Sequence, residues 1–275
     1  MERLNPKFND YQYPIDSKID RLIKVVKDWD SPQFREFLNN IDSYFKHNQA
    51  FHDYRNVLTR YDPNELLGIK SEIVVKKFKM TRKYDHLRFR FLPSKASRSL
   101  EIALVLLLNG LYTPRPIAVI EERGKFNRLV NSYLITEFIK FDCSFLQVIK
   151  ETDNNLKEKL IPETARKIRL MHDAGIIHND LHAANILIKN IETIPELYFI
   201  DLNRARRKKV LPTKTRAKDL GRLALDQRDQ ENFFRNYDPQ KNGRLLTEIR
   251  KAKHRREKWL AFKRFLRRLK SKIFT

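Results

Sequence analysis

Two short apolar stretches in the second half of the chain each lead into polar residues that suit one kind of chemistry. Residues 176–188 read IIHNDLHAANILI, and residues 198–206 read YFIDLNRAR. The first stretch carries Asp180 and Asn185, five positions apart, and the second carries Asp201. Phosphoryl transfer needs one carboxylate near the attacking hydroxyl and two oxygen ligands for Mg²⁺. The spacing therefore predicts Asp180 as a catalytic base, and Asn185 and Asp201 as metal ligands.

The order of these residues also matches a known catalytic loop. HNDLHAAN, at residues 178–185, follows the pattern H-x-D-L-x-x-x-N, and DLN, at residues 201–203, stands where D-F-G would. The chain therefore resembles the protein-kinase-like superfamily. This resemblance implies an α+β, two-lobed fold with a small β-rich N-terminal lobe and a larger helical C-terminal lobe. Asn179 replaces the Arg of regulated protein kinases, so we expect no switch through a phosphorylated activation segment.

A kinase-like fold also needs a lysine on its third strand and a glutamate on the helix behind that strand. Residues 73–76 read IVVK, which aligns with V-A-I-K. Side chains alternate along a strand, so Lys76 and Lys77 point to opposite faces and only one can reach the nucleotide. We predict Lys76. Glu101 is the one acid in the helix expected over residues 94–109, and we predict that it pairs with Lys76.

The loop that should cover the nucleotide phosphates is poorly marked. Residues 60–72 contain Gly68 as their one glycine, so the backbone donors to the phosphates cannot be named from the sequence. Arg55 and Asn56, on the preceding strand, are candidates for phosphate contacts. The alternative is that they belong to an ordinary edge strand.

The pattern of apolar residues divides the chain into four segments. We expect a helical extension at residues 1–48, an N-lobe at 49–139, a C-lobe at 140–243 and a basic amphipathic helix at 244–275. Ser31-Pro32 reads as the start of a helix within the extension. The hinge should fall near residues 137–141, and we assign Glu137 to the nucleotide site. The other expected elements are strands at 54–60, 72–79, 113–122 and 129–139, and helices at 94–109, 154–174 and 219–234.

A large positive charge is the second constraint on function. The 275 residues include 57 Lys and Arg against 34 Asp and Glu, a net charge of +23. Such a surplus indicates an anionic partner but does not choose among nucleic acid, a membrane and a phosphorylated substrate. Eight cations and no acid lie between Leu202 and Lys218. We assign Arg204, Arg206 and Arg207 to substrate binding, with a solvated basic loop as the alternative.

The C-terminal tail combines charge with an apolar stripe. Twelve Lys and Arg residues lie between Arg250 and Lys272. Apolar residues recur among them at spacings of three and four: Trp259, Phe262, Leu266, Leu269 and Ile273. This pattern predicts a helix at the surface of an anionic membrane. The alternative is that the stripe packs onto the large lobe and the charges are only solvated.

The sequence also limits the compartment. Cys143 is the single cysteine, which excludes an internal disulfide and fits a reducing environment. The longest apolar run, residues 102–108, is far short of the ~18 residues that span a membrane. The first residues, MERLNPKFNDYQYP, lack the apolar core of a secretory signal. We therefore expect a cytoplasmic protein, attached at most to the inner face of the inner membrane.

Several segments together resemble the lipopolysaccharide kinases, the Kdo and heptose kinase family. They are VVKKF, SKASRSLE, GLYTPRPIAVIE, HDAGIIHNDLHAANILI and YFIDLNRAR, and the likeness extends from about residue 56 to 234. The resemblance implies transfer of the γ-phosphate of ATP, with Mg²⁺, to a sugar hydroxyl (Kdo or heptose) of the lipid A–core. It also implies an anionic glycolipid as substrate. We expect a monomer and no nucleic-acid partner.

Two other functions remain open at this point. A RIO-like protein kinase or another small-molecule phosphotransferase would share Asp180, Asn185 and Asp201. The basic segment after Asp201 speaks against a cationic aminoglycoside acceptor, which it would repel. A pseudokinase that binds membrane or nucleic acid would fit the charge, but retention of the lysine, the glutamate, the base and both metal ligands argues against it.

Overall fold

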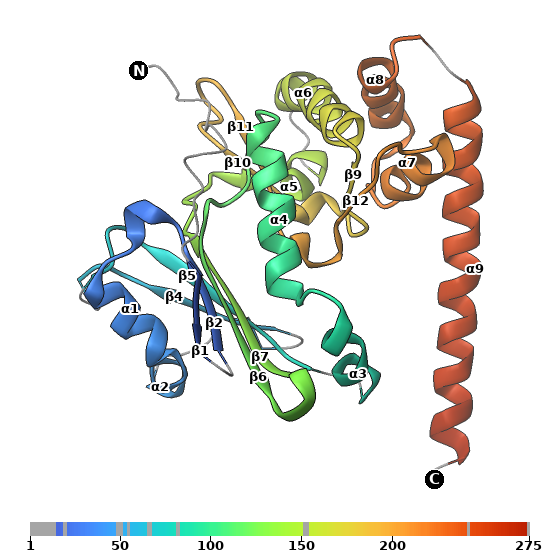
Figure 1. The fold of residues 1–275 in the computed structure, drawn as a ribbon. Helices are drawn as coiled ribbons and strands as arrows, with labels where there is room; N and C mark the ends of the chain where they lie inside the picture. Colours follow the sequence, from blue (N-terminus) through green and yellow to red (C-terminus); the bar gives the residue numbers. More distant parts are fainter. Residues whose placement is uncertain are drawn as a thin grey trace. The chain divides into compact units, whose positions relative to one another are not determined.

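The computed structural model describes residues 15–18, 21–47, 52–53, 56–64, 68–80, 83–150, 154–240 and 243–273 (Figure 1). Contacts within the chain divide it into two compact units. Unit 1 contains the described residues up to Asp142 together with residues 189–205. Unit 2 contains residues 143–188 and those from Arg206 onward.

Unit 1 is built on an antiparallel sheet. Within the described ranges the sheet has seven strands, in the order β1-β2-β6-β7-β5-β4-β3. They are β1 (Ile15–Lys18), β2 (Arg21–Val25), β3 (His52–Asp53), β4 (Asn56–Tyr61), β5 (Ile73–Phe78), β6 (Pro116–Gly124) and β7 (Arg128–Glu137). The strands expected from the sequence at β4, β5, β6 and β7 are all present.

The N-terminal segment departs from the expectation of a helical extension. Its strands β1 and β2 lengthen the sheet at the edge of β6. The physical reason is the period of two in β2, where Ile23 and Val25 are buried and Lys24 is only half-buried. Helices follow, namely α1 (Pro32–Asn39) and α2 (Ile41–His47). The predicted start of α1 is confirmed, because the Ser31 hydroxyl accepts a hydrogen bond from the Phe34 amide at 3.2 Å.

The sheet of unit 1 is covered on both faces (Figure 1). α1 and α2 pack on one face, around a cluster that includes Phe34, Phe37, Ile41, Ile73, Val75, Ile120 and Tyr133. On the other face lies α4 (Lys95–Leu108), around Phe78, Leu100, Val119 and Leu134. Odd positions of β5 therefore face α1 and α2, and even positions face α4. α4 begins and ends within one residue of the predicted helix, whereas α3 (Lys83–Phe91) was not anticipated.

The DLN turn belongs to unit 1 although much of unit 2 precedes it in sequence. Strand β11 (Glu196–Phe199) leads to it, and the short 3-10 helix η5 (Leu202–Arg204) follows. The Phe199 amide donates to the carbonyl of Tyr112 at 2.9 Å, and the Thr113 hydroxyl donates to the Phe199 carbonyl at 2.7 Å. The segment after α4 thereby fixes the strand that carries the turn.

Unit 2 is mainly helical. Its helices are α5 (Phe145–Lys150), α6 (Asn154–Asp173), α7 (Thr213–Leu220), α8 (Gln227–Tyr237) and α9 (Gly243–Ile273). Its short strands form two antiparallel pairs, β8 (Cys143–Ser144) with β10 (Ile186–Lys189), and β9 (Ile176–Ile177) with β12 (Arg206–Arg207). α6 packs against α8, and α7 packs against α9.

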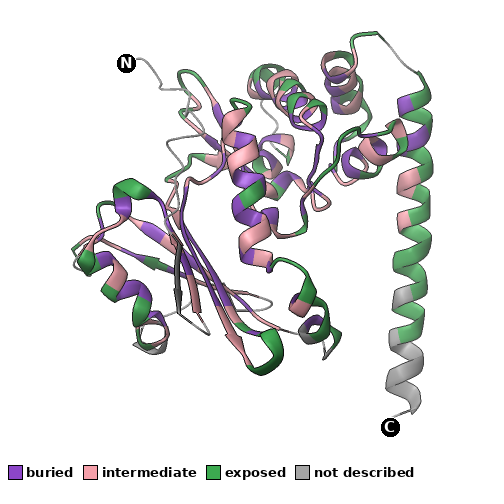
Figure 2. Cartoon of the chain, viewed as in Figure 1, coloured by how far each residue is buried: buried purple, intermediate pink, exposed green. Residues whose placement is uncertain are grey.

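The last helix changes its environment halfway along. Leu245, Glu248 and Ile249 are buried, and the packed face of α9 continues at four- and three-residue intervals to the half-buried Arg256. From residue 257 to 266 every described side chain is exposed (Figure 2). No described helix is long and apolar enough to cross a membrane.

Candidate active site

Lys76 and Lys77 have the opposite directions that strand alternation predicts. The Lys76 ammonium lies on the α4 face of the sheet and bonds to Asp201 Oδ1 at 2.5 Å. The Lys77 ammonium lies on the other face and bonds to Asp42 Oδ1, in α2, at 2.7 Å. The Tyr133 hydroxyl donates to the same Asp42 oxygen. Lys77 is thus part of the packing between α2 and the sheet, and Lys76 is the lysine next to a predicted metal ligand.

The DLN turn holds its aspartate in an unusual backbone conformation. Asp201 has φ +59° and ψ +50°, in the left-handed region that Asp tolerates better than most residues. Its Oδ1 also accepts a hydrogen bond from the Asn203 side-chain amide at 2.9 Å. Leu202, the residue between Asp201 and Asn203, is buried and anchors the turn. The carboxylate of Asp201 is consequently held in one place by the residues around it.

The predicted ion pair between Lys76 and Glu101 is not present in the structure. Glu101 is an exposed residue of α4, while Lys76 makes its ion pair with Asp201. The prediction took a lone acid on an apolar helix to be a buried partner. However, Ala96, Leu100 and Ala103 lie on the buried side of α4. The helical rotation between these positions directs the Glu101 side chain toward solvent.

A buried carboxylate does meet α4, but it comes from the sheet. Glu121 of β6 accepts hydrogen bonds from the Ser97 hydroxyl and, at 2.7 Å, from Arg123 Nη2. Burial would raise the pKa of Glu121, but the hydrogen bonds from Ser94, Ser97 and Arg123 outweigh it, and its pKa is lowered. The negative charge also faces the first turn of α4, where the helix dipole favours it. Glu121 fixes the position of α4 and was not found from the sequence.

The remaining residues predicted for the nucleotide lie in unit 1 as well. Glu137 ends β7, where its carboxylate accepts a hydrogen bond from Arg115 Nη1 at 3.3 Å. Asn56 is the first residue of β4, and Arg55 lies outside the described residues. Gly68 has φ +86°, and a Cβ there would lie 2.7 Å from the Cβ of Gln33. Gly68 is therefore required for close packing against α1.

The catalytic loop lies in unit 2, between β9 and β10. His178 is fully buried, Asn179 has φ +61°, and Asp180 is half-buried. The side-chain amide of Asn185 donates to the Asp180 carbonyl at 2.9 Å. That hydrogen bond uses the nitrogen of Asn185 and leaves its Oδ1 as the atom able to bind a cation.

One buried carboxylate fixes the backbone of this loop. Asp219 of α7 accepts hydrogen bonds from the His178 and Asn179 amides, each at 2.8 Å. Its Oδ2 also lies 3.3 Å from Nε2 of the buried His172. Burial would raise the pKa of Asp219, but its bonds to His172 and His178 outweigh this, and the pKa is lowered. Sequence reasoning missed this role, although Asp219 is the sole acid between Asp201 and Asp226.

Arg222 and His182 of unit 2 lie next to the carboxylate of the predicted base. Arg222 Nη1 lies 3.1 Å from Asp180 Oδ1, and His182 Nε2 lies 3.5 Å from the same oxygen. Arg256 of α9 lies 3.4 Å from His182 Nε2. Burial lowers the pKa of His182, and the charges of Arg256 and Arg222 lower it further against the opposing charge of Asp180. A neutral His182 can accept the hydrogen bond from Arg256.

The basic segment after Asp201 divides into structural and exposed residues. Arg216 is structural, because its Nη1 bonds to Asp173 at 2.6 Å. Arg206 and Arg207 form β12, and Arg207 is exposed, as is Arg204 at the end of η5. The structure does not show what these three residues bind, so their assignment to substrate stays a prediction.

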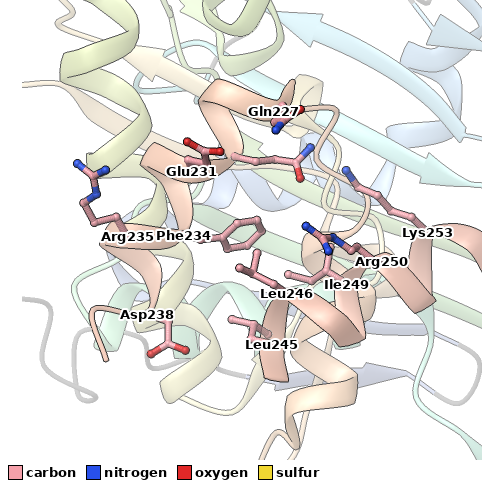
Figure 3. Close-up of a pocket in the computed structure, with 11 residues that line it drawn as sticks. Gln227, Glu231, Phe234, Arg235, Asp238, Leu245, Leu246, Ile249, Arg250 and Lys253 are labelled. Carbon is pink, nitrogen blue, oxygen red and sulfur yellow. The ribbon is translucent and has the colours of Figure 1, made fainter. Parts of the chain in front are cut away.

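A separate groove of about 660 Å³ lies between α8 and α9 (Figure 3). Its floor is apolar and its rim is charged, with lining residues that include Phe234, Leu245, Leu246, Ile249, Glu231 and Arg250. None of the residues predicted for the active site is among the described residues that line it.

The predicted metal ligands suit Mg²⁺ in their chemistry. Asp201 offers a carboxylate and Asn185 an amide oxygen, and both are the hard oxygen donors that Mg²⁺ prefers. Asn185 Oδ1 is oriented by the bond of its own amide nitrogen, and Asp201 is held by Asn203. Each of the two residues therefore offers a donor atom that suits the ion.

Comparisons with known proteins give a consistent result. Residues 73–241 match the family described as lipopolysaccharide kinase (Kdo/WaaP). A 3-deoxy-D-manno-octulosonic acid kinase of Haemophilus influenzae is 32% identical over 126 residues, which cover 44% of this chain and 51% of the relative. The lipopolysaccharide core heptose(I) kinase WaaP of Pseudomonas aeruginosa is 34% identical over 132 residues, which cover 42% of this chain and 49% of the relative.

A solved structure shares the fold. It is described as WaaP in complex with acyl carrier protein, and it matches with a TM-score of 0.58 and 21% identity over 82% of this chain and 97% of that one. The predicted protein-kinase-like fold is thereby confirmed. The chain spans about half the length of the curated relatives that it matches.

The Asp219 contacts lead to a prediction about stability. Asp219→Asn replaces one acceptor oxygen with an amide nitrogen that cannot accept the loop's N–H groups, which should lower the free energy of unfolding by about 1–3 kcal/mol at pH 7. Because the pKa of Asp219 is lowered in the fold, its contribution is present above about pH 4 and is lost as pH falls below that value. Urea unfolding at pH 7 and at low pH measures both effects.

The matched control is Asp238→Asn, at the half-buried end of α8. It should change the unfolding midpoint little at either pH. A wild-type advantage over Asp219→Asn that stays constant down to pH 3 would contradict the account of a charged Asp219.

Proposed function

Because the chain belongs to the lipopolysaccharide kinase (Kdo/WaaP) family, we propose that it transfers the γ-phosphate of ATP to a sugar hydroxyl of the lipopolysaccharide inner core. The acceptor would be Kdo or heptose, as the names of the two relatives suggest. One observation carries the proposal beyond the family. Asp180, the predicted base, lies on a loop whose backbone is held by the buried Asp219.

The residues divide into two tasks. Mg²⁺·ATP, when bound, supplies the electrophilic phosphorus and neutralises part of the phosphate charge. In unit 1, Lys76 would bind the nucleotide phosphates, and Asp201 would be the carboxylate ligand of the metal. In unit 2, Asn185 would add its amide oxygen as a ligand. Asp180 would accept the proton of the attacking sugar hydroxyl as the new bond to phosphorus forms.

The ion pair between Lys76 and Asp201 fits this division. Each residue has a charge opposite to that of its proposed ligand. Lys76 is cationic and would bind the anionic phosphates, and Asp201 is anionic and would bind Mg²⁺. The Lys76 ammonium and the Asp201 carboxylate neutralise each other at 2.5 Å. Nucleotide and metal would replace that contact with stronger ones for both residues.

The exposed part of α9 supports attachment to a membrane surface. Trp259, Phe262 and Leu266 are 54%, 50% and 44% exposed, so they do not pack as the alternative reading of the stripe required. At about 100° per residue their face is rotated by roughly a quarter turn from the packed face that ends at Arg256. Cations surround the stripe. We infer that this end of α9 lies on an anionic leaflet, near the lipid substrate.

The chemical step should depend on Asp180. Asp180→Asn should lower kcat by about 10²–10⁴-fold, the usual contribution of a positioned base, while ATP binding survives. The measurement is phosphate transfer to purified lipid A–core, alongside ATP titration. Asp142→Asn, an exposed carboxylate, is the control. Near-wild-type turnover of Asp180→Asn would reject Asp180 as the base.

The exposed part of α9 should be needed for binding to lipid vesicles and not for phosphate transfer itself. The triple substitution of Trp259, Phe262 and Leu266 by Ser leaves the net charge unchanged. It should abolish binding to vesicles rich in anionic phospholipid, yet spare turnover on a delipidated acceptor. Wild-type binding should weaken with salt, because each near-surface cation contributes about 1 kcal/mol.

A control for this experiment is Phe126→Ser, which also removes an exposed apolar side chain. It should leave vesicle binding unchanged. If the triple variant binds vesicles as tightly as wild type, the membrane role is wrong. An acyl carrier protein, which accompanies the structural neighbour, would then be the next partner to test.

A further inference from the structure

Four side chains of unit 2 form a continuous row at the catalytic loop. Arg222 contacts Asp180 at 3.1 Å, Asp180 contacts His182 at 3.5 Å, and His182 contacts Arg256 at 3.4 Å. Asp180 must meet the acceptor hydroxyl if it is the base. Arg222 and His182, which contact its carboxylate, would therefore lie beside that hydroxyl.

The two arginines reach this row from different helices. Arg222 follows α7, one turn after the Asp219 that holds the loop. Arg256 is half-buried on the packed face of α9, and every described side chain from residue 257 to 266 is exposed. α9 packs against α7, and it reaches His182 of the catalytic loop through Arg256. The position of Arg256 is thus set by the whole packed half of α9.

The row carries an excess of positive charge. It contains two guanidinium groups, which are always charged, and only one carboxylate. Among the described residues, the bond to His182 is the one hydrogen bond of Arg256. A guanidinium has five N–H groups, so Arg256 can still donate two of them to an anion in a forked arrangement.

We propose that Arg222 and Arg256 form a subsite for a carboxylate of the acceptor sugar, next to the hydroxyl that Asp180 deprotonates. This inference rests on the proposed function and deepens it by naming the feature of the acceptor that the enzyme recognises. The substrate class is an acidic sugar, and an octulosonic acid is a sugar that carries a carboxylate. α9 would then have two roles along its length, acceptor recognition at Arg256 and lipid binding beyond it.

The test is steady-state kinetics with an O-deacylated lipid A that carries one 3-deoxy-octulosonic acid residue, as the free acid and as its methyl ester. O-deacylation leaves only the amide-linked acyl chains, which reduces the contribution of membrane binding. For the free acid, Arg256→Gln should raise KM by about 10- to 100-fold and change kcat by less than about threefold. Arg256→Lys should give an intermediate KM, because it keeps the charge but loses the fork. Arg228→Gln, the same charge change at an exposed position of α8, should match wild type.

The ester comparison separates recognition from structure. Wild type should lose about the same factor in KM on the ester as Arg256→Gln loses on the acid. Arg256→Gln should have the same KM for acid and ester. The substitution and the esterification each remove the same interaction, the one between the Arg256 guanidinium and the sugar carboxylate. The wild-type arm needs no substitution, so it holds even if a variant folds poorly.

Two outcomes would overturn the inference alone. One is a wild-type enzyme that uses acid and ester equally well, and the other is an Arg256→Gln variant with the KM of wild type on the acid. In both cases transfer by wild type leaves the proposed function standing. If wild type transfers no phosphate to this acceptor, the assignment to acidic sugars and the subsite fail together.

Discussion

The carboxylate of Asp219 is the constraint on which the catalytic half of this protein depends. It is fully buried, yet it remains charged because two backbone amides of the catalytic loop and the ring of His172 bond to it. Those bonds fix the loop from which Asp180 projects. If Asp180 is the base, as we propose, it is effective only when it is held in place, and the buried charge of Asp219 then supports the chemistry as well as the fold.

The nucleotide half follows from a second, simpler constraint, the alternation of side chains along β5. Odd positions, including Val75, complete the core under α1 and α2, and Lys77 extends it through Asp42. Even positions face α4, which leaves Lys76 to meet Asp201. A shift of one residue in the register would exchange the two lysines and bury the wrong one.

The sequence predicted these features where local rules apply and failed where tertiary contacts decide. Strand alternation predicted the opposite directions of Lys76 and Lys77, and capping rules placed the start of α1. Glu101 was assigned by its isolation in sequence, but only packing decides which face of α4 is buried. Asp219, Glu121 and Arg256 act on residues 24 to 74 positions away, and no spacing rule connects such pairs. The strands β1 and β2 were missed because the apolar stripe of α1 dominated their segment.

The direct test of the central claim is the phosphate content of the acceptor in cells. Mass spectrometry of lipid A–core from cells that lack this protein should show the loss of phosphate from an inner-core sugar. Wild-type protein should restore it, and a protein with Asp180→Asn should not, although it is present in equal amount. Unchanged phosphate on the inner core of cells lacking the protein would contradict the account.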